Sequence, residues 1–111
     1  MIRRLVRSVI RNARVTATND SPSLRLDRVL MNAMEVRAFE EVEIVNEATG
    51  VRCTTWVEEG GGGEVRIPHM PVGDTVTIIS LGLLHDGQTL AHKARVVTVG
   101  PKNEVVSIAE S

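Results

Sequence analysis

The sequence predicts a mainly β protein, a small closed barrel with one or two short helices. Several short runs alternate apolar and polar residues with the period of a strand. Clusters of turn-forming residues separate these runs, and only one short segment after the first strand has a clear helical start. Many short strands would expose unpaired edges, and closing the sheet removes them. The 111 residues suit one domain, 1–111, with a single core.

Composition limits the classes of function. Apolar residues make up 42%, and 13 Lys and Arg nearly balance 14 Asp and Glu, which is typical of a folded globule. A net charge of −1 gives no general attraction to nucleic acid or to an anionic membrane, and no run is long enough to cross a bilayer. Cys53 is the only cysteine, which excludes an internal disulfide and favours a reducing cytoplasm. Phe39 and Trp56 are the only aromatic residues, so the core must be aliphatic, and such a small core favours oligomerisation.

The first segment has two interpretations. Residues 1–19 hold five arginines and no acid, and their apolar residues also fit a basic amphipathic helix of the kind that serves as an address or lies on a membrane. Ile2, Val6, Val9 and Ile10 are β-branched, however, and β-branched residues favour strands. We expect a long first strand, with the helix as the alternative.

A turn and a short helix follow. The run Asn19–Ser23 gathers turn formers and should end the first strand. Asp27 is a good N-cap, and the helix should end near Glu35. One side of this helix is expected to carry Val29, Leu30, Ala33 and Met34.

A hairpin is expected next. Period-two alternation begins at Glu41, residues 47–50 form the turn, and residues 51–57 return. The alternation puts Val51, Cys53, Thr55 and Val57 on one face and Arg52, Thr54 and Trp56 on the other. Arg52 and Trp56 therefore share a face, about 13 Å apart.

The rest of the chain is expected to alternate loops and strands. Residues 58–63 form a flexible loop, 64–67 a short strand and 75–84 a fully buried strand. Residues 85–87 form a turn, 92–99 the last strand, and a polar tail follows Gly100.

Local signatures of chemistry are few. The glycine run 60–63 lacks the lysine and serine or threonine of a phosphate loop. The three histidines, His69, His85 and His92, lack the spacing of a metal site, so no metal ligand is expected. Two features remain, Ser23 in its turn and the face of Arg52 and Trp56. Taken alone, these residues are more simply a turn hydroxyl and surface side chains.

The order of several short motifs resembles one family. The chain begins Met-Ile-Arg, continues with Pro22-Ser23 before Leu26-Asp27, and carries Arg-Cys-Thr-Thr-Trp at 52–56. Val-Gly-Asp at 72–74 then precedes an apolar strand, and Lys-Asn-Glu follows at 102–104. In this order and spacing the sequence is similar to the aspartate 1-decarboxylases of the pantothenate pathway. The resemblance implies a six-stranded double-psi β-barrel and a homotetramer.

The resemblance also implies a mechanism. Ser23 would attack the carbonyl of Pro22, and the chain would split into residues 1–22 and 23–111. Ser23 would become a pyruvoyl cofactor, a ketone that condenses with the amine of an amino-acid substrate and accepts the electrons left by carbon dioxide. Thr55 matches the threonine that hydrogen-bonds the scissile carbonyl, Arg52 would clamp a substrate carboxylate, and Trp56 stands at the position of the proton donor. Whether a maturation partner assists the cleavage is left open.

Departures from the family pattern keep other functions in view. Pro22 replaces the family's glycine and Trp56 its tyrosine, while Val9 and Arg11 stand where it has lysine and histidine. The asparagine-rich segment that lines the family's pocket is shortened to residues 66–69. These changes favour a second hypothesis, an uncleaved, non-enzymatic barrel that binds a small carboxylate or a protein partner. A third hypothesis uses the N-terminal arginines as a nucleic-acid-binding arm. The leading expectation remains a decarboxylase that converts aspartate to β-alanine, or a relative with another amino-acid substrate.

Overall fold

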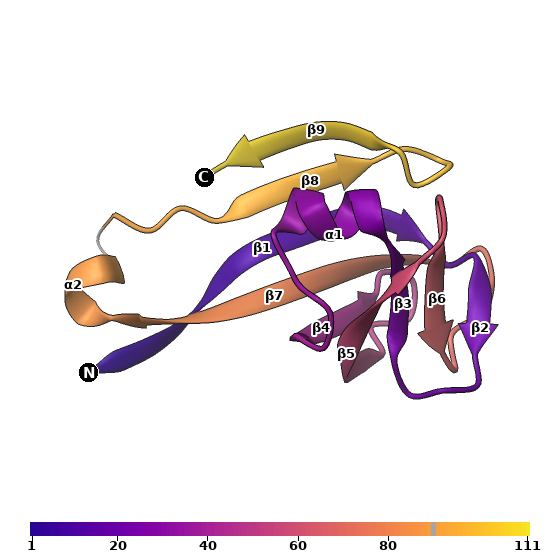
Figure 1. The fold of residues 1–111 in the computed structure, drawn as a ribbon, viewed down its shortest axis with the longest axis horizontal. Coiled ribbons are helices and arrows are strands. Elements are labelled where there is room, and N and C mark those ends of the chain that lie inside the picture. Colours follow the sequence, from indigo (N-terminus) through magenta and orange to yellow (C-terminus); the bar gives the residue numbers. More distant parts are fainter. Residues whose placement is uncertain (90) are drawn as a thin grey trace.

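The protein is mainly β. The computed structural model describes residues 1–89 and 91–111, in which nine strands accompany two short helices (Figure 1). In chain order the elements are β1 (Ile2–Arg14), β2 (Ala17–Asn19), β3 (Leu24–Asp27), α1 (Arg28–Met34), β4 (Glu41–Asn46), β5 (Arg52–Gly60), β6 (Val65–Pro68), β7 (Thr75–His85), α2 (Asp86–Thr89), β8 (Arg95–Val99) and β9 (Val105–Glu110). Within the described residues, no helix is long and apolar enough to cross a membrane.

All nine strands belong to one mixed sheet. Its order is β2-β6-β3-β5-β4-β7-β1-β8-β9, which leaves β2 and β9 at the two ends. Consecutive pairs such as β4 and β5 are antiparallel, while β1–β8, β2–β6 and β3–β5 are parallel pairs of strands far apart in sequence. No pairing between the end strands β2 and β9 appears in this order, so the sheet is not closed in the described residues. The closed six-stranded barrel stays a prediction.

The first segment is a strand, as expected. β1 runs antiparallel to β7 along nearly its whole length and parallel to β8 over Ser8–Arg11. Figure 1 shows the β1–β7 ribbon extending away from the other strands toward α2. The strand preference of the β-branched residues in β1 therefore outweighs its helical periodicity, and β7 and β8 supply backbone partners on its two sides.

The short helix lies where Asp27 predicts it. The Asp27 carboxylate accepts a hydrogen bond from the Val29 backbone N–H at 2.8 Å, and Glu35 ends the helix in the left-handed conformation. The expectation for Val29 was wrong, since its side chain is 60% exposed. Met31 is buried instead, because the helix turns Leu30, Met31, Ala33 and Met34 toward the sheet.

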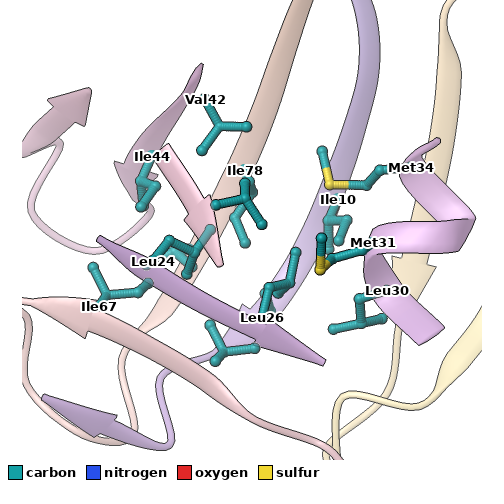
Figure 2. Packing of buried hydrophobic residues seen from close by; sticks show 14 of the residues in the cluster. Ile10, Leu24, Leu26, Leu30, Met31, Met34, Val42, Ile44, Ile67 and Ile78 are labelled. Carbon is teal, nitrogen blue, oxygen red and sulfur yellow. The ribbon is translucent and has the colours of Figure 1, made fainter. Parts of the chain in front are cut away.

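An aliphatic core fills the space between α1 and the inner face of the sheet (Figure 2). Fully buried side chains come from β1, β3, β4, β6, β7 and α1: Ile10, Leu24, Leu26, Leu30, Met34, Ile44, Ile67 and Ile78. Neither aromatic residue belongs to it, since Phe39 is 73% exposed and Trp56 37%. The expected aliphatic core is confirmed.

Five expectations for the second half need correction. Residues 58–60 are not loop, because they continue β5 in parallel pairing with Arg25–Asp27 of β3. β7 is not fully buried; its burial alternates, because only one face of the sheet meets the core. At the predicted turn 85–87, β7 ends at His85 and α2 begins at Asp86, and the last predicted strand begins at Arg95 rather than at residue 92. The tail after Gly100 forms β9, which gains a backbone partner along β8.

Candidate active site

Ser23 lies in the turn between β2 and β3 and is completely buried. Its hydroxyl oxygen is 3.2 Å from the hydroxyl of Ser21. Burying a hydroxyl is costly unless it is hydrogen-bonded. The simpler interpretation of Ser23 is an exposed turn hydroxyl. The burial of Ser23 does not fit that interpretation.

The carbonyl of the preceding residue has its own donor. The Thr55 hydroxyl donates a hydrogen bond to the carbonyl oxygen of Pro22. This contact follows from strand register, because the parallel pairing of β3 with β5 begins at Leu24 and Val57. The residues just before each of these positions, including Pro22 and Thr55, are thereby brought together.

Asn19 is a member of the site that sequence reasoning missed. Its side chain is buried, and its Nδ2 donates to the Ser23 carbonyl at 2.7 Å and lies 3.4 Å from the Ser23 hydroxyl. Its Oδ1 accepts a hydrogen bond from the Ser21 backbone N–H at 3.2 Å. That second contact closes an Asx turn, a motif that asparagine followed by small polar residues commonly forms. The signal was present in the turn cluster, but it did not reveal the bond to Ser23.

Arg52 and Trp56 lie on the outer face of β5, as the alternation predicts, and Thr55 points to the inner face. The Arg52 guanidinium forms an ion pair with Glu43, which lies diagonally across the hairpin because Arg52 is paired with Val45. A cavity of about 310 Å³ opens on the same side, lined by residues of β1, β4, β5 and β7: Arg4, Glu41, Val42, Glu43, Thr54, Ile79, Leu81 and Leu83.

β5 thus divides the candidate residues between its two faces. Ser23, Pro22 and Thr55 form one hydrogen-bonded cluster with Asn19 on the inner side. Arg52 is three residues along the strand from Thr55, about 10 Å away, and faces outward. The structure brings the predicted processing residues together and leaves the predicted substrate clamp apart from them.

The other positions of interest are ordinary sheet residues. Val9 is paired in the sheet with Ile79 and Val96, and Arg11 is an exposed residue opposite Thr98. Burial raises the pKa of the Cys53 thiol, which keeps that side chain protonated. In the parts of the chain that the structure describes, no three His, Cys, Asp or Glu side chains are grouped to hold a metal.

The fold and the site define a class: small, mainly β proteins with a buried, hydrogen-bonded serine turn between two strands. Comparison with known proteins identifies the family, because the aspartate decarboxylase family model matches residues 1–106. The chain belongs to the aspartate decarboxylase family.

Three relatives illustrate the match, each named aspartate 1-decarboxylase. The protein of Shouchella clausii is 31% identical, over 97% of this chain and 92% of its own. That of Bacillus licheniformis is 32% identical, over 95% and 90%. The one from Methylibium petroleiphilum is 29% identical, over 97% and 98%. The resemblance predicted from ordered motifs is confirmed at the level of the family.

Proposed function

We propose that this protein is a self-processing, pyruvoyl-dependent aspartate 1-decarboxylase that makes β-alanine for pantothenate biosynthesis. The observation that carries the proposal is the Thr55 hydroxyl hydrogen-bonded to the Pro22 carbonyl, next to the buried hydroxyl of Ser23. The family of the chain and the names of its relatives support the choice of reaction. The roles of the individual residues follow from their contacts.

The first chemical step is an acyl shift at Ser23. Its Oγ attacks the Pro22 carbonyl carbon, the carbon–nitrogen bond breaks, and the proton of the hydroxyl passes to the released amine. Negative charge develops on the Pro22 carbonyl oxygen as the tetrahedral intermediate forms. The hydrogen bond from Thr55 strengthens as that charge grows, which is how an oxyanion donor lowers a barrier. Proline at position 22 keeps the carbonyl that this step needs.

The site fits a pyruvoyl group made from residue 23. Ser23 is buried among Asn19, Ser21 and Thr55, so the group would be held away from bulk water. A pyruvoyl group supplies a ketone that condenses with a substrate amine and withdraws electrons from the bond to the departing carboxylate. Removal of water strengthens the hydrogen bonds that orient it.

Arg52 is the proposed substrate clamp, and because it faces away from Ser23 within one copy, the clamp would have to serve the Ser23 of a neighbouring copy in the homotetramer proposed below. Aspartate carries two carboxylates, and a planar guanidinium binds a carboxylate through two parallel hydrogen bonds. In the free protein Glu43 occupies one arm of Arg52, so substrate binding exchanges one carboxylate for another. Trp56 lies on the same outer face, about 13 Å along β5 from Arg52. Its indole N–H is a poor proton donor at neutral pH, so we do not assign the proton transfer to Trp56.

We further propose a closed six-stranded double-psi barrel, assembled as a homotetramer in the cytoplasm. Parallel pairing of distant strands, as in β1–β8 and β3–β5, supports the interlocked connections of such a barrel. Exposed apolar residues on the β1–β7 ribbon, including Ile2, Val6 and Leu83, support burial against other copies. The single cysteine is consistent with a reducing compartment. Light scattering on the purified protein tests the tetramer.

Intact mass measurement of the purified protein tests the function. We expect two fragments that correspond to residues 1–22 and 23–111, with the larger one carrying the pyruvoyl mass. Ser23→Ala should remain a single chain and should make no β-alanine from aspartate. A wild-type protein that stays at full length under all conditions would contradict the proposal.

One observation favours a second candidate function. Trp56 replaces a phenolic proton donor and lies on the same face of the sheet as the Arg52–Glu43 pair and the outer cavity, which suits an uncleaved protein that binds a small carboxylate. Titration of the full chain with aspartate, followed by calorimetry, distinguishes the two. Binding without cleavage or β-alanine supports this alternative.

A further inference from the structure

Two consecutive carbonyl groups at the predicted cleavage site each have a side-chain donor. The Pro22 carbonyl accepts from Thr55, and the Ser23 carbonyl accepts from Asn19 at 2.7 Å. Thr55 comes from β5 and Asn19 from β2, and both side chains are buried. The proposed function gives Thr55 a role and leaves Asn19 without one.

The geometry of the turn separates two tasks of the Asn19 side chain. Its Oδ1 accepts from the Ser21 N–H, and this contact alone closes the Asx turn. Its Nδ2 contributes nothing to that turn and is directed at Ser23 instead. An aspartate at position 19 would keep the turn and lose the contact with Ser23, because an ionised carboxylate only accepts hydrogen bonds.

Cleavage requires a second step in which charge develops at a different oxygen. After the acyl shift, Pro22 is joined to Ser23 Oγ as an ester. A solvent base then removes the Ser23 Cα proton, the Cβ–Oγ bond breaks, and Pro22 departs as a free carboxylate. Residue 23 is left as a dehydroalanine, which water hydrolyses to the ketone with release of ammonia. While the Cα proton leaves, the electron pair is delocalised onto the carbonyl oxygen of Ser23.

We propose that Asn19 is the oxyanion donor for this elimination step, as Thr55 is for the acyl shift. The inference rests on the proposed function and assigns it a further catalytic residue. The Asn19 Nδ2 contacts the carbonyl oxygen that takes the charge, at 2.7 Å. The same nitrogen lies 3.4 Å from Ser23 Oγ, the atom that leaves with Pro22. One amide group thus faces both atoms that gain electrons in the second step.

The two assignments predict that the variants stop at different intermediates. Thr55→Val should stop before the ester forms and should remain an intact amide-linked chain. Asn19→Asp and Asn19→Ala should pass the first step and accumulate the ester, with chain separation slowed about 10²–10³-fold, the usual effect of removing one oxyanion donor. Asn19→Asp retains the acceptor of the Asx turn, so it is the matched control for the fold.

Hydroxylamine distinguishes the intermediates, because it cleaves an ester and leaves an amide intact under mild conditions. Each full-length variant is purified, treated with hydroxylamine and weighed by mass spectrometry. We expect the Asn19 variants to release residues 1–22 as a hydroxamate and to leave a chain that begins with an unmodified Ser23. Thr55→Val should resist the reagent, and the wild-type chain should separate without it.

Three results would overturn the inference. Asn19 variants that separate at the wild-type rate, or that stay both intact and resistant to hydroxylamine, give Asn19 no role in elimination. If Asn19→Ala does not fold, Asn19→Asp decides the question by the same two criteria. A wild-type chain that never separates removes the proposed function and the inference together, whereas a separating wild type with unaffected Asn19 variants removes only the inference.

Discussion

Replacing Thr55 with valine tests the central contact of the site. Valine keeps the shape of threonine and lacks the hydroxyl that donates to the Pro22 carbonyl. If this hydrogen bond only held the turn together, its loss would cost about 1–3 kcal/mol of stability. For a chain of this length that lowers the melting temperature by about 4 °C per kcal/mol. If the bond stabilises the oxyanion, self-cleavage slows about 10²–10³-fold, which corresponds to roughly 2.7–4 kcal/mol in the barrier.

The assay follows the fraction of intact chain by mass over time, together with thermal unfolding of the same samples. Thr55→Ser restores the hydroxyl and serves as the matched control, which should cleave much faster than Thr55→Val. Cleavage of Thr55→Val within about tenfold of the wild-type rate would refute the oxyanion role. Equal rates for the serine and valine variants would also refute it, because the hydroxyl is the group that distinguishes them.

Three further predictions concern substrate binding, the helix start and pH. Arg52→Ala should raise the KM for aspartate about 10–100-fold, since it loses charge-assisted hydrogen bonds, and chain separation at Ser23 should proceed; steady-state kinetics and mass measurement check both. Asp27→Ala should destabilise the fold by about 2–3 kcal/mol in urea unfolding, because the carboxylate caps α1 and accepts from the Gly63 N–H at 2.7 Å. Backbone N–H groups of Glu104 and Lys102 lower the pKa of the Glu104 carboxyl. Its contribution to stability is therefore present above the ordinary pKa and lost as pH falls through the lowered one, and Glu104→Gln should flatten that part of the pH dependence of unfolding.

The sequence predicted those parts of the fold that local patterns determine. Asp27 has a cap role that depends on the next few residues, and the two faces of β5 follow from strict alternation. The strand at 105–110 was missed because most of its residues are exposed, and what defines it is pairing with β8. The length of β5 was underestimated for a similar reason, since Glu58 and Glu59 are held in the strand by β3. Pairing between distant segments leaves no local signal in one sequence.

In the candidate site, too, the sequence predicted some residues but not all of their contacts. Ser23, Thr55 and Arg52 could be selected because their motifs occur in a familiar order, and the contact between Thr55 and Pro22 could be expected only from that resemblance. Asn19 could be predicted as a turn residue, but its bond to the Ser23 carbonyl depends on how the chain folds back between β2 and β3 and buries Asn19 and Ser23. The division of the site between the two faces of β5 was implicit in the alternation, which already separated Thr55 from Arg52 and Trp56.

The polar network around Ser23 differs from the other buried polar groups of the core. Asn46 accepts from the backbone N–H groups of Ala48 and Thr49 and donates to the Asp74 carboxylate, while Asn103 donates to the carbonyls of Arg14 and Gly63, and these contacts satisfy both buried amides. Around Ser23, by contrast, two side-chain donors from different strands converge on two consecutive carbonyls of the same turn. In a turn whose carbonyls faced water, neither side-chain donor would be needed, because water could bond to both carbonyls. Because each buried polar side chain adds a desolvation cost to a small domain, their convergence on the two peptide units that flank Ser23 is best explained by chemistry at that residue.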